Sequence, residues 1–242
     1  MGARDAAGVS RPHPRVLRGE LLRRVDPQHR SLGQFFQDEI ASPLGLDVYI
    51  RLPESIPNSR LASLAPPSPI AMLLGFPLRI TLDSMNRRSN IYRALITNPG
   101  TAIVQNGQHV YARNFEVPSG GGVGTARGIA QAYSVFATGG RELGLRSDTL
   151  ELLAAPAIPP TRGFYDECLK SDGVQFSLGF MKPSPAWPFG NVGSFGAPGS
   201  GGSLGFADPI AGIGYAYVTS HPAVAVANRR FVTRQPLWRQ VA

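Results

Sequence analysis

The last third of the chain repeats short apolar segments separated by glycine-rich turns. Residues 192–199, 201–208 and 212–219 read VGSFGAPG, GGSLGFAD and GIGYAYVT, and Asp208-Pro209 marks the second turn. Short strands joined by tight turns pair as an antiparallel sheet. With 28 glycines and 22 prolines in 242 residues, a pure helical bundle is disfavoured. Because the helical patterns lie mainly before this region, the sequence predicts an α+β fold, with helices first and the sheet last.

The rest of the chain carries the periodicities of both helices and strands. We expect a disordered N-terminal segment over 1–18, whose end overlaps a helical pattern at 15–25, and one domain over 19–242. Asn106-Gly107 indicates a hairpin within 103–117. Apolar spacing predicts further helices over 31–45, 83–97, 125–140, 147–154 and 221–235, and strands over 46–52 and 173–181.

The charge and the cysteine count exclude several classes of function. The net charge is +8, and only Lys170 and Lys182 among the 24 basic residues are lysines. The arginines are spread along the chain without interleaved aromatic residues, which favours a solvated basic surface and no nucleic-acid partner. A single cysteine, Cys168, excludes an internal disulfide, and the four histidines lie far apart. We therefore predict neither a metal site nor a cofactor.

No part of the sequence has the pattern of a membrane or targeting segment. No stretch reaches eighteen apolar residues, so no membrane span is predicted. The first fifteen residues hold no apolar signal core, which favours a cytoplasmic location and leaves a mitochondrial one open.

Two glycine-rich motifs resemble a phosphate-binding loop and a nucleophile elbow, and neither meets the full requirements of its motif. The loop 118–124 (PSGGGVG) has neither the lysine of a P-loop nor the spacing of a dinucleotide loop, so a tight loop that delivers a helix is favoured. Residues 201–205 match G-x-S-x-G around Ser203. That motif needs a helix directly after the serine, whereas Asp208-Pro209 leads into another strand. A nucleophile elbow at Ser203 is therefore disfavoured.

Three segments, taken together, resemble one known family. Residues 195–218 (FGAPGSGGSLGFADPIAGIGYAYV) are similar to the closing strands of the serine β-lactamase and penicillin-binding superfamily, in particular its class C-like esterases. Residues 19–54 and 118–140 resemble other segments of that family, in the family's order. The resemblance implies a partial β-lactamase/transpeptidase-like fold, in which a helical region precedes the antiparallel strands and a closing helix. It also implies a serine hydrolase of esterase or peptidase type, with a small ester or amide as ligand.

The family's catalytic motifs are not found in this chain. A serine with a lysine one helical turn later, S-x-x-K, allows the amine to take the hydroxyl proton. The residues three places before the two lysines are Glu167 and Gly179, and the family's tyrosine motif falls near Val9-Ser10. Ala197 stands where the family has lysine or histidine. We therefore expect no catalytic residue, a truncated domain whose nucleophile helix would precede residue 1, and a catalytically incompetent chain.

The resemblance still implies a cleft wall that could hold a ligand. We expect its residues to be Ser119, Pro198, Gly199, Ser200, Gly201 and Ser203. Backbone amides near Ser200 or Gly201 could face an oxyanion. The alternative hypothesis is a non-catalytic binding or self-assembling scaffold, because a mitochondrial member of this superfamily forms filaments. That alternative leaves a homo-oligomer open.

Overall fold

The protein is built around a five-stranded antiparallel sheet in which the strands follow one another in chain order, β5-β6-β7-β8-β9. A computed structural model describes residues 12–63, 78–93, 105–106, 109–110, 113, 116, 118, 120–161, 163–166, 171–199 and 202–220. The sheet strands are β5 (Gln175–Ser177), β6 (Phe180–Lys182), β7 (Phe195–Pro198), β8 (Leu204–Asp208) and β9 (Ile213–Tyr217). Two small strand pairs join β1 (Val48–Tyr49) to β4 (Val123–Gly124), and β2 (Gln105–Asn106) to β3 (His109–Val110).

The helices lie mainly ahead of this sheet in the sequence, as an α+β fold requires. They are α1 (Pro12–Val25), α2 (Leu32–Phe36), the π-helical turn η1 (Gln37–Ala41), the 3₁₀ turns η2 (Asn58–Arg60) and η5 (Arg141–Leu143), α4 (Leu78–Met85), α6 (Ala126–Ala137) and α7 (Ser147–Ala154). In the part of the chain that the structure describes, no helix is both long and apolar enough to cross a bilayer.

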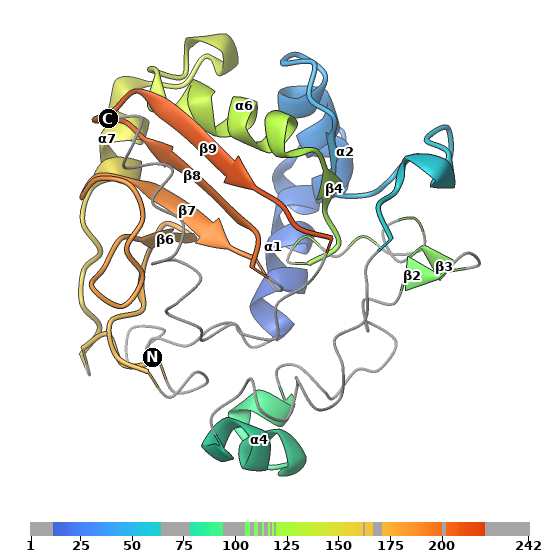
Figure 1. The fold of residues 1–242 in the computed structure, drawn as a ribbon. Coiled ribbons are helices and arrows are strands. Elements are labelled where there is room, and N and C mark those ends of the chain that lie inside the picture. Colours follow the sequence, from blue (N-terminus) through green and yellow to red (C-terminus); the bar gives the residue numbers. More distant parts are fainter. Residues whose placement is uncertain are drawn as a thin grey trace.

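Helix α6 covers one face of the sheet (Figure 1). Successive residues of a strand point to opposite faces, so Gly205 and Ala207 of β8 share the face towards α6. A Cβ on Gly205 would lie 2.7 Å from the Tyr133 ring, so glycine permits the close approach of helix and strand. Further along, Ala137, Phe195 and Ala207 form a buried cluster between α6 and the sheet.

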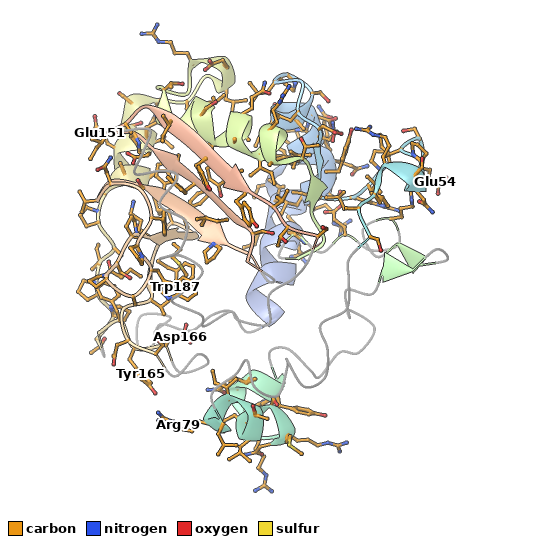
Figure 2. The ribbon with its side chains drawn as sticks, viewed as in Figure 1. Glu54, Arg79, Glu151, Tyr165, Asp166 and Trp187 are labelled. Atoms are coloured by element: carbon orange, nitrogen blue, oxygen red, sulfur yellow. The ribbon has the colours of Figure 1, made fainter. Side chains whose placement is uncertain are left out.

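The opposite face of the sheet carries a second apolar core. Phe206 points to this face, where it packs with Val174, Met181 and Phe189. The Phe206 ring stacks on Tyr215 with a centroid distance of 5.1 Å. Trp187 also packs against this cluster (Figure 2). Apolar clusters therefore pack against both faces of the sheet around β7 and β8.

The N-terminal helices begin where the sequence provides a start signal. Ser31 caps α2 in a capping box with Gln34, as its position before the apolar run predicts. Helix α1 begins at Pro12, because proline is well suited to a first helical position. Residues 12–14 are thus helical where we expected disorder, residues 15–18 follow the helical pattern predicted over 15–25, and residues 1–11 lie outside the described residues. The division into 1–18 and 19–242 otherwise stays a prediction.

Two elements differ from the sequence-based expectation. The strand expected over 173–181 is a hairpin, because Leu178 and Gly179 take positive φ angles of 50° and 90° and reverse the chain. The alternation of apolar residues continues through this turn and conceals it. The helix expected over 83–97 is instead α4 with a turn after Met85, and the helix expected over 221–235 lies outside the described residues.

Candidate functional site

Three of the residues predicted to line a cleft wall lie at or beside the turn that joins β7 to β8. Pro198 is paired with Leu204, and the Gly199 amide donates a 2.7 Å hydrogen bond to the Ser203 carbonyl oxygen. Pro198, Gly199 and Ser203 therefore lie close together, and their role in binding a ligand stays a prediction. Ser119, Ser200 and Gly201 lie outside the described residues, and their placement in the site stays a prediction.

Strand β7 is paired unequally on its two sides. All four of its residues pair with β8, whereas its ladder with β6 consists of the single pair Met181 and Gly196. Beyond Gly196, Ala197 and Gly199 are exposed and Pro198 is half-buried. An antiparallel strand that is paired on one side can take an extended group along its other edge. On this open edge Pro198 has no N–H to donate, and the Gly199 amide is already bonded to Ser203, so the described edge offers a carbonyl acceptor to a ligand.

The described residues 120–124 of the glycine loop lead into α6, whose first turn lies over Gly205 of β8. At the start of α6, Thr125 accepts a 3.1 Å hydrogen bond from the Gly128 amide and caps the helix. Ile129, in the first turn that follows, lies over Gly205, which is two residues after Ser203. Ala137, at the other end of α6, packs against Phe195 and Ala207. The favoured interpretation of the loop, that it delivers a helix, agrees with this arrangement.

Lys182 is a buried lysine on the α6 side of the sheet. Only 2% of this residue is exposed, and its ammonium group donates a 2.7 Å hydrogen bond to the Leu153 carbonyl oxygen near the end of α7. The Phe195 ring lies 5.4 Å from the same nitrogen. Burial lowers the pKa of Lys182 to about 8. Lys182 therefore caps a helix and holds its charge in an apolar setting, a role that the sequence did not indicate.

The buried charge of Lys182 should make the stability of the protein depend on alkaline pH. Because the pKa is about 8 in the folded protein and 10.5 for a lysine exposed to water, the unfolded chain binds more protons between these values. The free energy of unfolding should therefore rise as pH increases from 8 to 10.5. Urea unfolding of Lys182→Met should lack this rise. Equal slopes in the wild type and in Lys182→Met would contradict the assignment.

Two hydroxyl groups near the sheet, those of Tyr133 and Ser203, do not fit the catalytic roles that their positions suggest. Tyr133 is inserted between α6 and β8, and burial raises the pKa of its phenol to about 12, which makes it a poor general base. Ser203 is followed by strand β8 and not by a helix. The rejection of a nucleophile elbow at Ser203 is thereby confirmed, and His221 lies outside the described residues.

A separate pocket of about 350 Å³ contains none of the predicted site residues. Ser31, Arg51, Arg113 and Glu116 are among its lining residues. The Ser31 hydroxyl donates a 2.7 Å hydrogen bond to Glu116, whose carboxylate also accepts from the Gly33 amide at 2.8 Å. Because the same hydroxyl accepts from the Gln34 amide, this cluster is a helix cap that joins two distant parts of the chain. Sequence analysis missed Glu116, since its partners lie more than 80 residues away.

The described residues bring no group of three or more His, Cys, Asp or Glu side chains within reach of one metal ion. At the β7–β8 turn the described polar groups are the Ser203 hydroxyl and backbone groups, and the Gly199 and Gly202 amides donate to carbonyl oxygens within the turn.

Comparison with known proteins assigns the chain to a family. The Beta-lactamase family model matches residues 16–234, and the chain therefore belongs to the β-lactamase family. The esterase/β-lactamase LipL of Mycobacterium tuberculosis is 30% identical over 214 residues, which cover 86% of this chain and 48% of LipL. The chain thus spans about half the length of the curated relative that it matches. The resemblance seen in residues 195–218 is confirmed.

Solved structures confirm a partial β-lactamase-type fold. A penicillin-binding protein homologue from Caulobacter crescentus superposes with a TM-score of 0.72 and 27% identity, over 94% of this chain and 57% of the homologue. EstA from Arthrobacter nitroguajacolicus Rue61a gives a TM-score of 0.72 at 24% identity, over 100% of this chain and 61% of EstA. A family VIII carboxylesterase gives 0.67 at 30% identity, over 89% and 53% of the two chains.

Proposed function

We propose that this chain forms the substrate-binding wall of a β-lactamase-family serine hydrolase for a small ester or amide, and that the chain alone does not turn that substrate over. The family membership and two relatives described as an esterase/β-lactamase and a carboxylesterase support the substrate class. The one-sided pairing of β7 supports an open edge along which such a ligand could lie.

The position of Lys182 carries the second half of the proposal. In the S-x-x-K motif the lysine must lie one helical turn after the nucleophilic serine. Lys182 instead lies in a strand, three residues after Gly179, and its ammonium group is bound to the Leu153 carbonyl oxygen. Lys170, the other lysine, follows Glu167 at the same spacing. Neither lysine of this chain can therefore serve as the base of that motif.

The ligand would lie along the edge of β7 beyond Gly196. In this mode Pro198, Gly199 and Ser203 form its wall, and we propose that Ser119, Ser200 and Gly201 complete it. We propose that backbone amides near Ser200 or Gly201 donate hydrogen bonds to a carbonyl oxygen placed at the turn and stabilise negative charge there. Binding without a nucleophile leaves the scissile bond intact.

Turnover of two chromogenic substrates tests the proposal directly. We expect the purified chain to hydrolyse nitrocefin and p-nitrophenyl butyrate no faster than a heat-treated sample does. Removing the nucleophile from a comparable catalytic triad lowers the rate about a million-fold, so the difference from an active hydrolase is easily measured. Hydrolysis well above the heated control would overturn the proposed lack of turnover.

One variant tests which of two differences from the family would explain a lack of turnover: the missing nucleophile, or Ala197 in β7 in place of a basic residue. Ala197→Lys introduces a basic residue at the exposed position where the family carries one. If the nucleophile is the missing group, Ala197→Lys should remain inactive and should still bind the β-lactam or ester in ligand-observed NMR. Bulky Gly199→Trp should abolish that binding while the circular dichroism spectrum is unchanged. If folded Gly199→Trp gives the same ligand signals as the wild type, the ligand binds elsewhere and the proposed wall is contradicted.

A further inference from the structure

Helix α4 presents an apolar stripe to solvent. Leu78, Leu82 and Met85 are 72%, 57% and 77% exposed. Their spacing of four and three residues places all three side chains on one helical face. Large apolar side chains that gather on an exposed face commonly mark a binding surface. Figure 1 shows α4 standing apart from the β5–β9 sheet and from the helix that covers it.

The segment that carries this stripe is held by its own hydrogen bonds. The Ser84 hydroxyl donates to the Thr81 carbonyl oxygen at 2.7 Å, and the Ser89 hydroxyl donates to the Asp83 carbonyl oxygen. Ile91, in the turn of helix that follows, is buried with 6% of its surface exposed. Helix α4 itself has no buried residue, so Ile91 is the buried position of the described segment 78–93.

Three exposed arginines lie close to the stripe in the sequence. Arg79 lies on α4 beside Leu78 and reaches outward, as Figure 2 shows. Arg87 and Arg88 follow Met85 in a turn that the Arg88 amide closes by donating to the Asn86 side chain at 3.0 Å. Within the described residues, no carboxylate forms an ion pair with any of these three guanidinium groups. An apolar stripe bordered by positive charge is complementary to a surface that is apolar inside and negative outside.

We propose that α4 binds an anionic lipid surface, with Leu78, Leu82 and Met85 inserted at the interface and Arg79, Arg87 and Arg88 on the lipid phosphates. Interfacial helices combine an apolar face with basic residues that contact anionic headgroups. A second copy of the chain is a poorer occupant, since it brings the same arginines and the same net charge of +8. The inference is independent of the proposed hydrolase function.

Co-sedimentation with lipid vesicles tests the proposal on the full chain. We expect the chain to sediment with vesicles of phosphatidylcholine and phosphatidylglycerol, and to remain in solution with phosphatidylcholine alone. We expect two variants each to weaken the binding by about tenfold or more. Leu78→Ser/Leu82→Ser/Met85→Ser removes the apolar side chains that would insert at the interface. Arg87→Glu/Arg88→Glu removes two positive charges that would attract the anionic headgroups.

Matched variants show whether vesicle binding depends on α4 or on the net charge of the whole protein. Arg127→Glu/Arg141→Glu changes the net charge by the same amount at two other exposed arginines. Ile158→Ser/Val192→Ser/Ile210→Ser removes three other exposed apolar side chains. Both controls should keep most of the wild-type binding. If they weaken it as much as the α4 variants do, or if the wild type fails to sediment, the proposal is wrong.

A fluorescence measurement locates the contact on the helix. Leu82→Trp should be quenched by brominated lipids in anionic vesicles, whereas Ile158→Trp should be quenched no more than the wild-type background. Analytical ultracentrifugation of the same samples without lipid should give equal masses for the wild type and the serine triple variant at α4. A mass that falls on removal of the stripe would assign the stripe to self-association and overturn lipid binding.

Discussion

Gly214→Ala should unfold the protein or destabilise it by more than about 4 kcal/mol, which is exceptional for one methyl group. A Cβ at this position of β9 would lie 2.2 Å from the Ala130 carbonyl oxygen and 2.2 Å from the Ser134 amide nitrogen of α6. Both atoms belong to the backbone of a helix, so neither can rotate away. The helix would have to move off the sheet and would disrupt the cluster around Phe195.

Urea unfolding followed by circular dichroism measures this effect, and Gly122→Ala is the matched control. A Cβ on Gly122 would meet only the Tyr49 carbonyl oxygen, at the ordinary distance of 3.8 Å. The stability of Gly122→Ala should therefore stay within about 0.5 kcal/mol of the wild type. A folded Gly214→Ala with wild-type stability would show that α6 does not lie this close to β9.

Asp208→Asn should destabilise the protein by about 2–4 kcal/mol, since buried donors would lose their acceptor. Asp208 is 2% exposed, and its carboxylate accepts hydrogen bonds from the Asn191 amide and side chain at 2.8 and 2.9 Å. Its second oxygen accepts from the Ile210 and Ala211 amides, both at 3.1 Å. An asparagine side chain would keep one acceptor and would turn its NH₂ group towards donors.

The same carboxylate should contribute to the acid sensitivity of the protein. Burial alone would raise the pKa of Asp208, but hydrogen bonds from the Ala211 and Asn191 amides outweigh burial and hold the pKa below 3.8. Stability from Asp208 is therefore present above pH 3.8 and is lost as pH falls through the lowered pKa. Exposed Asp172→Asn is the control and should be nearly neutral. Equal losses in the two variants would contradict the role of Asp208.

The C-terminal strands could be predicted because their signals are local. The glycine turns and Asp208-Pro209 bound three alternating segments, and β7, β8 and β9 fall within those segments. Thr125 and Ser31 were predictable as helix caps for the same reason. The β5–β6 hairpin was missed because a leucine at positive φ is rare, and no local preference indicates it.

The residues of the β7–β8 turn could be identified from the sequence, whereas the packing around the turn could be known only from the tertiary structure. The identity of Pro198, Gly199 and Ser203 and the absence of S-x-x-K can be read from the chain alone, because both depend on neighbours in sequence. Three other features could not be read from the sequence: the one-sided pairing of β7 beyond Gly196, the capping of α7 by Lys182, and the exposed apolar stripe of α4. Each of these features depends on burial and on partners distant in sequence, and these are fixed only when the chain packs in three dimensions.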